Sequence, residues 1–458
     1  MHLFYDISLS RRHSGTPHGL ARVEVSIAKA LLQSDCSVNA IWITDNQEIV
    51  IGESDVLHSL TDGSASSEAA FANFAIHKPA RKVSSHLLQE LKRITYRDRM
   101  IVLATYTISF FPDVFSKLIW NVSRKSFFLL SRIKNTFRKV RFKTSSPTKF
   151  QNKSKNALNL NSKSLILIAG NDWDRRILEH IPTEMDSRLK IAVVIYDLIP
   201  YEFPHYSVDL PTAGRFTFWI GDIAQRSDYL FFISKFSQDR FNAMLTDRCI
   251  ESQAKQMVID LPPGILPAPG ASEPDFSSEI GEQFILVVCT IESRKNHQVL
   301  LSALRLAMSL GEQFPQLVFI GSPGWGTKTL MREIDTDERL RNRIVLKSGI
   351  SDNELRWLYE KCTAVAYPSI VEGFGLPVFE SAVFRKPIVT SDIPVFDEIP
   401  HPLRTKVNPY DTAGWKVALQ NVGTKSMPDG GWQELEIPTW IDNVNKMIAF
   451  MSDETKVQ

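Results

Sequence analysis

Residues Tyr367–Glu380, which read YPSIVEGFGLPVFE, are the most informative stretch of the chain. An apolar run before it predicts a β-strand, two glycines predict a loop, and Pro377 suits the first position of a helix because its missing N–H would be unpaired there anyway. Gly373 and Gly375 allow backbone amides to approach a ligand closely. The helix start adds further amides and the positive end of a helix dipole, so the stretch predicts an anion site suited to phosphate.

Two glutamates flank these glycines. Glu372 precedes them, and Glu380 lies about one turn into the predicted helix, so both can border one pocket. A carboxylate in such a place accepts hydrogen bonds from vicinal hydroxyls of a ribose or a hexose. A Gly-x-Gly pattern alone would favour the simpler interpretation, a glycine-rich turn with two solvated glutamates.

The rest of the chain predicts two doubly wound α/β domains. Short β-branched runs alternate with helix-like stretches, as in βαβ units. Residues 261–270 (LPPGILPAPG) can continue neither a helix nor a central strand, so we place the domain boundary there. Ligands of such sheets bind beyond the carboxyl ends of the strands, which favours the cleft between the domains. The predicted strands are Met1–Ser8, Val38–Thr44, Met100–Thr105, Leu165–Ala169, Ile191–Asp197, Tyr229–Ser234, Phe284–Thr290, Gln316–Gly321, Arg343–Gly349, Thr363–Ser369 and Lys386–Asp392.

Composition limits the class of protein. A chain of 458 residues with 43% hydrophobic and 23% charged residues is typical of a globular protein of two to three domains. The four cysteines lie far apart, with no C-x-x-C pair, which fits a reducing cytosol. The sequence shows no signal peptide and no apolar run long enough to span a membrane. We therefore expect a cytoplasmic protein.

The net charge of +2 hides a strongly basic segment. Residues 114–171 contain 13 Lys and Arg and no Asp or Glu, which leaves 40 basic against 51 acidic residues elsewhere. Within the insertion at about 110–164, apolar residues recur at helical spacing over 115–143, which predicts a basic amphipathic helix or helical pair. Contact with an anionic membrane surface is the favoured interpretation. Packing on its own domain is the alternative, and no nucleic-acid-binding module is visible.

The spacing Glu-x7-Glu around Gly-Phe-Gly-Leu-Pro, after Tyr-Pro-Ser, resembles the signature of the retaining glycosyltransferases of family 4, which have the GT-B fold. The stretches Thr290–Asn296 (TIESRKN), Gly321–Gly326 (GSPGWG) and Ser351–Tyr359 are similar to further elements of that family. The resemblance is dense from about Phe284 to Glu398, thinner in the first half, and absent from the basic insertion. It implies an acceptor-side domain at 1–265, a donor domain at 280–430, and a helix at 432–452 that crosses back to the first domain.

The resemblance also implies the roles of individual residues. Arg294 and Lys295 would hold the diphosphate of a nucleotide sugar, and Glu372 the donor sugar, and these three form the predicted catalytic set. Two fixed cations can stabilise the charge on a leaving diphosphate without a metal, so no metal and no cofactor are expected. A solvated helix start is the simpler interpretation of the two cations, although they would oppose the helix dipole. The predicted donor-binding residues are Glu380 at the ribose, Gly373, Phe374, Gly375, Leu376, Gly19 and Ile350.

Acceptor-side candidates come from the first domain. Tyr196 and Asp197 stand where relatives often have His-Asp, and Arg22 follows the first predicted strand. The Asp-x-Asp at 172–174 matches a metal-binding pattern of a different glycosyltransferase fold, and we interpret it as a helix cap with surface charge.

The sequence thus predicts a retaining hexosyltransferase that moves a sugar from a nucleotide diphosphate to a glycan or lipid-linked glycan acceptor. The implied setting is capsule or O-antigen synthesis in the cytoplasm, with peripheral contact to the membrane. Two alternatives stay open, a GT-B nucleotide-sugar epimerase or phosphorylase and a non-catalytic scaffold that binds nucleotide sugars. The absence of a G-x-G-x-x-G after a suitable strand disfavours an oxidoreductase.

Overall fold

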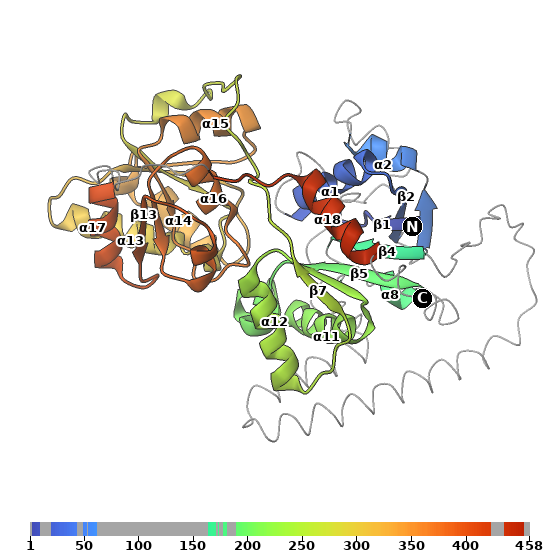
Figure 1. Ribbon diagram of the computed structural model, residues 1–458. Helices are drawn as coiled ribbons and strands as arrows, with labels where there is room; N and C mark the ends of the chain where they lie inside the picture. The colour runs from blue at the N-terminus through green and yellow to red at the C-terminus, as the bar shows by residue number, and fades with distance from the viewer. Residues whose placement is uncertain are drawn as a thin grey trace, which may run out of the picture.

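The computed structural model describes residues 2–9, 20–43, 49–52, 54–61, 164–170, 173, 177–180, 189–422 and 435–452. Gly19, the predicted strand Met100–Thr105 and, except for Ser164, the predicted basic insertion lie outside these residues. The described chain forms two α/β domains that lie side by side, with the C-terminal helix packed on the first (Figure 1).

The first domain has a seven-stranded sheet of order β3-β2-β1-β4-β5-β6-β7. All neighbours are parallel except β2 and β3. Its strands are β1 (His2–Asp6), β2 (Ser37–Ile43), β3 (Ile49–Gly52), β4 (Ser164–Ile168), β5 (Lys190–Ile195), β6 (Tyr229–Phe232) and β7 (Lys255–Val258). Its helices are α1 (Leu20–Gln33), α2 (Ser54–Thr61), α8 (Ile177–His180), α10 (Ile199–Glu202), η2 (Pro204–Tyr206), α11 (Leu210–Arg226) and α12 (Lys235–Arg248).

The second domain has a six-stranded, fully parallel sheet of order β10-β9-β8-β11-β12-β13. Its strands are β8 (Phe284–Val288), β9 (Gln316–Ile320), β10 (Ile344–Lys347), β11 (Ala364–Tyr367), β12 (Ile388–Ser391) and β13 (Arg404–Val407). Its helices are η3 (Ser277–Glu279), η4 (Ser293–Lys295), α13 (His297–Ser309), α14 (Lys328–Thr336), η5 (Glu338–Leu340), α15 (Asp352–Lys361), α16 (Leu376–Val383), η6 (Pro394–Glu398) and α17 (Thr412–Asn421), and α18 (Trp440–Ser452) ends the described chain.

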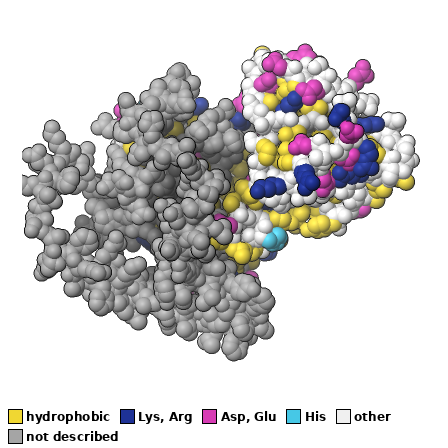
Figure 2. All heavy atoms as spheres, turned by 180° about the vertical axis from the view of Figure 1, so that it is seen from behind, with side chains coloured by type: hydrophobic (Ala, Val, Ile, Leu, Met, Phe, Trp, Pro, Cys, Tyr) yellow, Lys and Arg dark blue, Asp and Glu magenta, His cyan; other side chains and the backbone are white. Residues whose placement is uncertain are grey.

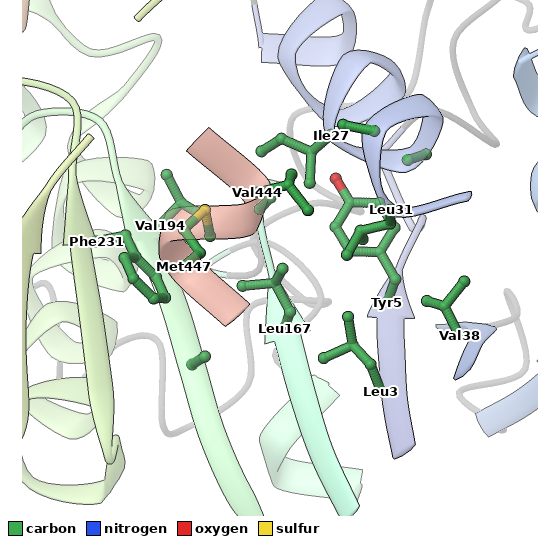
Figure 3. Packing of buried hydrophobic residues seen from close by; sticks show 14 of the residues in the cluster. Leu3, Tyr5, Ile27, Leu31, Val38, Leu167, Val194, Phe231, Val444 and Met447 are labelled. Carbon is green, nitrogen blue, oxygen red and sulfur yellow. The ribbon is translucent and has the colours of Figure 1, made fainter. Parts of the chain in front are cut away.

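Each sheet has a hydrophobic core on both faces, because successive side chains of a strand point to opposite sides. In β1, Leu3 and Tyr5 enter one core and Phe4 enters the other. Helix α18 belongs to the first of these cores, where Val444 and Met447 pack with α1 against the sheet (Figure 3). The last helix of the chain is therefore part of the first domain's core.

The predicted doubly wound architecture is confirmed. Every predicted strand within the described residues is present, with ends that differ by at most two residues. Three strands escaped prediction: β3, β7 and β13. Each has four residues at the edge of a sheet, and β7 (KQMV) and β13 (RTKV) carry cations that interrupt the apolar pattern. Edge strands commonly carry charged side chains, which explains why they were missed.

On the face of the second domain seen in Figure 2, basic and acidic side chains lie among apolar and polar ones. This mixture fits the ion pairs that the domain forms, such as Arg305 with Glu333 at 2.6 Å. None of the helices in the described part of the chain has both the length and the apolar character needed to cross a membrane.

Candidate active site

Two loops of the second domain build the centre of the candidate site. Strands β8 and β11 are parallel neighbours, so the loops that follow them leave the same edge of the sheet. The first loop carries Arg294 and Lys295, and the second carries Glu372. The amide of Ile370 donates to the carbonyl of Arg294 at 2.8 Å, and the side chain of Asn296 donates to the carbonyl of Pro368 at 3.2 Å. These bonds hold the two loops in register.

The three predicted catalytic side chains are in direct contact. Nη1 of Arg294 donates to Oε2 of Glu372 at 2.9 Å, and Lys295 forms a short ion pair with the other carboxylate oxygen. Nε of Arg294 donates to Glu292 at 3.1 Å, and Nζ of Lys295 donates to the hydroxyl of Tyr367 at 2.8 Å. Glu372 and Lys295 are only 6% and 7% exposed, so this is a buried, polar, closely paired cluster.

The electrostatics of the cluster fix its protonation. Burial raises the pKa of Glu372, but the charges of Lys295 and Arg294 outweigh burial and hold this pKa at about 2. Burial lowers the pKa of Arg294, whereas Glu372 and Glu292 raise it above its ordinary value. At neutral pH Glu372 is therefore an anion that cannot serve as a general acid.

The glycine loop brings its backbone close to the first domain. A Cβ at Gly373 would lie 2.4 Å from the carbonyl oxygen of Tyr196, so the backbone of Gly373 lies directly against that of Tyr196. Gly375 has a φ of 115°, which few other residues adopt, and directly precedes α16. Pro377 is the second residue of α16, one position later in the helix than predicted. Phe374 contacts the cores of both domains.

Glu380 lies one turn into α16, in a separate group of contacts. One carboxylate oxygen accepts a hydrogen bond from the hydroxyl of Tyr359 at 2.6 Å, and the other from the amide of Gly264 at 3.1 Å. Gly264 belongs to the segment between the domains. Burial raises the pKa of Glu380, opposed by the Tyr359 bond. Glu380, the residue predicted to bind the ribose, thus contacts the segment between the domains directly.

Arg22 lies beside Glu380 and not beside the Arg294–Lys295–Glu372 cluster. Its guanidinium donates to the carbonyl of Gly264 at 2.8 Å and to Asp352 of the second domain at 2.9 Å. Ile350 follows β10 and packs at the border of the second domain's core. Leu376 is the first residue of α16, and Gly19 lies outside the described residues.

The two remaining acceptor-side candidates face the glycine loop. Cβ of Asp197 would lie 2.9 Å from a Cβ at Gly373, and one carboxylate oxygen of Asp197 accepts from the amide of Ile199. Burial raises the pKa of Asp197, and the nearby charge of Arg294 lowers it. The hydroxyl of Tyr196 instead donates to the carbonyl of Ala169 within its own domain, at 2.5 Å.

Several residues of the site were not predicted. Tyr367 and Glu292 contact the cluster, and Tyr359 contacts Glu380. Ser234 and Ser237 at the start of α12 donate to the carbonyl of Gly373 at 2.6 and 3.2 Å and so join the domains. Tyr367 and Glu292 lie within the quoted motifs, which was a usable signal. Nothing in the sequence marks the two serines beyond a helix cap.

The arrangement can bind a substituted diphosphate. The hydrogen bonds described for Arg294 use Nε and Nη1, which leaves Nη2 for an anionic oxygen. Helix α16 begins four residues after Glu372 and adds the positive end of its dipole. Among the described residues, no group of three His, Cys, Asp or Glu side chains is placed to hold a metal ion.

The part of the chain that carries this cluster resembles known sequences. Residues 273–407, which contain the whole cluster, match the family model of glycosyl transferases group 1. The serotype-specific mannosyltransferase WbdA of Escherichia coli is 26% identical over 252 residues, which cover 52% of this chain and 31% of that protein. The O-antigen chain mannosyltransferase RfbU of Salmonella typhimurium is 37% identical over 99 residues, 22% of this chain and 28% of that one. The match thus spans about a third or less of these relatives.

Comparison with solved structures concerns the fold. HepE of Anabaena, solved in complex with UDP and glucose, aligns with a TM-score of 0.55 over 98% of this chain and 99% of that one, at 14% identity. Sucrose-phosphate synthase of Thermosynechococcus elongatus aligns with a TM-score of 0.53 over 99% and 98%, at 13% identity. The chain therefore has the GT-B fold, as its sequence predicted, and its residues 273–407 match the family model of glycosyl transferases group 1.

Proposed function

We propose that the chain is a retaining glycosyltransferase that moves a hexose from a nucleotide-diphosphate sugar to a growing glycan of a cell-surface polysaccharide. The observation that carries this proposal is the buried cluster of Arg294, Lys295 and Glu372 beside the start of α16. Mannose is the favoured sugar, because the curated relatives are mannosyltransferases of O-antigen synthesis.

The reaction breaks the bond between C1 of the sugar and a phosphate oxygen and forms a bond from C1 to an acceptor hydroxyl. Charge then builds on the departing diphosphate, where Arg294, Lys295 and the amides of α16 stabilise it. The acceptor attacks the face that the diphosphate leaves, and its proton passes to a phosphate oxygen. Glu372 orients the two cations and the sugar hydroxyls and stays ionised throughout, since its pKa is held at about 2.

Both oxygens of Glu372 are occupied by cations, which supports a positioning role over that of a nucleophile. The leaving charge is met by fixed cations, so the proposal includes independence from a metal. We expect full activity in the presence of EDTA and α-configured product by NMR from an α-linked donor. A β-configured product would contradict retention.

The decisive experiment compares turnover in Lys295→Ala and Glu372→Gln with the wild type, using GDP-mannose, UDP-glucose and UDP-N-acetylglucosamine as donors and α-mannotetraose as acceptor. Each variant is expected to lose at least about 100-fold in kcat, because it removes or misplaces a fixed cation. Lys235→Ala is the control, since Lys235 is an exposed partner of Asp239 on α12. Wild-type turnover in either site variant would overturn the assignment.

The same assay separates the alternatives. An epimerase or phosphorylase would convert the donor without acceptor or in the presence of inorganic phosphate. A scaffold would show a donor-induced rise in melting temperature without hydrolysis or transfer.

The proposal places the enzyme in the cytoplasm with a glycan or lipid-linked acceptor. Membrane contact through residues 115–143 remains a prediction. Sedimentation with liposomes that contain anionic lipid at low salt, compared with neutral liposomes, tests it.

A further inference from the structure

Aromatic side chains gather where the two domains meet. Trp325 follows β9 and is 37% exposed, and Tyr410 follows β13 and is 71% exposed. Tyr206, half-buried at the end of η2 in the first domain, lies against both: its carbonyl accepts a hydrogen bond from the indole N–H of Trp325 at 2.8 Å, and its hydroxyl interacts with Tyr410. We refer to Tyr206, Trp325 and Tyr410 as the aromatic rim.

The rim brings exposed apolar surface from both domains together. Trp325 and Tyr410 are two of the eight large hydrophobic side chains that are clearly exposed among the described residues. The ring of His205 lies 4.2 Å from that of Tyr206, centroid to centroid. Exposed apolar surface that gathers in one place, and is edged by polar groups, marks a binding site more often than a chance feature.

The rim borders the proposed donor site on two sides. Trp325 follows Gly324 directly, and a Cβ at Gly324 would lie 2.7 Å from the side chain of Glu292, which binds Arg294. Tyr410 follows Pro409, whose carbonyl accepts from the side chain of Asn296 at 2.8 Å. Asn296 itself follows Lys295. Trp325 and Tyr410 are therefore each one residue away from a residue that contacts the turn that contains Arg294 and Lys295.

We propose that the aromatic rim is a subsite for the acceptor glycan, an assignment that rests on the proposed glycosyltransferase function. A pyranose has an apolar face of C–H groups and a polar edge of hydroxyls. The rim offers the matching surface, aromatic faces with hydroxyl, indole and imidazole groups at their edges. Because the rim adjoins the reacting groups and lies on both domains, a glycan bound there presents its end to the cleft.

A glycan suits this rim better than an acyl chain does. All three rim residues and His205 carry a hydrogen-bonding group, and one of these groups already joins the two domains. A lipid chain would leave such polar groups without water, which costs free energy.

The test measures binding and transfer separately, with α-mannotetraose as probe. We compare wild type with Trp325→Ala, Trp325→Phe and Tyr410→Ala by saturation-transfer NMR without donor and by steady-state kinetics. Trp325→Ala and Tyr410→Ala are expected to raise the acceptor KM and weaken tetraose binding at least about fivefold, with the donor KM within twofold of wild type. Trp325→Phe keeps a ring but loses the N–H bond, so it should stay within threefold of wild type. Leu310→Ala is the control, because Leu310 is exposed at the opposite edge of the sheet.

The outcomes distinguish the two proposals. Transfer with an acceptor KM unchanged in Trp325→Ala and Tyr410→Ala would overturn the rim and leave the function standing. Tetraose binding that depends on the rim, without transfer by the wild type, would support the proposed acceptor subsite and contradict the proposed glycosyltransferase function. A Trp325→Phe variant as weak as Trp325→Ala would show that Trp325 serves only as a domain contact and would overturn the proposal. Neither binding nor transfer by the wild type would overturn both.

Discussion

At the scale of single residues, Glu372 shows how a buried charge is stabilised. Removing a carboxylate from water is costly, and here two cations compensate for that cost. A substitution that keeps the shape but not the charge separates this electrostatic contribution from packing. The contribution has a defined dependence on pH, which makes it measurable.

We predict that the wild type loses stability relative to Glu372→Gln as the pH falls from about 4.5 to about 2. The pKa of Glu372 in the folded protein is about 2, below the ordinary 4.5, so its ion pairs stabilise the fold above pH 4.5 and are lost as it becomes protonated. The shift corresponds to about 3 kcal/mol in the free energy of unfolding. Urea denaturation at several pH values measures it. Glu312→Gln is the control, because Glu312 is exposed and pairs with Lys416. This substitution should change the free energy of unfolding little at any of these pH values. If the free energy of unfolding varies with pH in the same way for wild type and Glu372→Gln, the prediction is wrong.

At the scale of elements, the loop before α16 depends on glycine for two separate reasons. Gly375 needs a left-handed backbone and also lies against the ring of Phe396, 2.6 Å from a would-be Cβ. Gly349, which follows β10, also has a positive φ, 72°, but no atom lies within 4 Å of a would-be Cβ there. Gly373 needs only space, because Tyr196 of the other domain touches it. The three glycines therefore separate backbone strain from steric exclusion.

We predict that Gly349→Ala lowers the free energy of unfolding by about 1 kcal/mol and leaves donor binding unchanged. Gly375→Ala should cost more, since the ring of Phe396 must also move, and should weaken donor binding. Gly373→Ala should weaken donor binding at least tenfold with little loss of stability, because it forces the domains apart. Urea denaturation and donor-induced thermal shifts measure these effects. Equal losses in all three variants would show that strain alone decides.

Helix α18 offers a second prediction at this scale. Met447 is buried in the core of the first domain, beside Val194 and Phe231 of the sheet, although it lies near the end of the chain (Figure 3). Met447→Ala should lower the free energy of unfolding by about 2–4 kcal/mol, the usual cost of truncating a buried methionine. Lys446→Ala on the same helix removes only an exposed pair with Asp260 and should cost under about 1 kcal/mol. Denaturation with urea compares them, and equal stabilities would mean that α18 does not support the first domain.

At the scale of the whole molecule, the sequence predicted the contacts that form within one domain and missed the contacts that form between the two domains. The sequence predicted that Arg294, Lys295 and Glu372 lie close together. The motifs that contain them mark the ends of two strands, and strand ends of a parallel sheet share one edge. The contacts of Gly264 with Glu380 and Arg22 join residues 116 and 242 positions apart. They depend on how the domains sit against each other, which no local pattern of apolar residues or glycines encodes. The aromatic rim was missed for the same reason.

The interdomain contacts suggest how donor binding is coupled to the relative position of the domains. Gly264 lies between Glu380, which accepts from its amide, and Arg22, which donates to its carbonyl and also binds Asp352. Ribose hydroxyls that bind Glu380 would compete with the amide of Gly264. The hydrogen bonds of Arg22 to Gly264 and Asp352 would then be the main contacts that join the first domain to this region. We predict that Arg22→Ala weakens donor binding five- to tenfold and increases the radius of gyration without donor, measured by calorimetry and X-ray scattering. Lys190→Ala breaks a similarly exposed pair within the first domain and should change neither. If Arg22→Ala has the wild-type affinity and radius, Arg22 does not connect the nucleotide site to the linker, and other contacts between the domains, such as those of Ser234 and Ser237 with Gly373, hold them together around the donor.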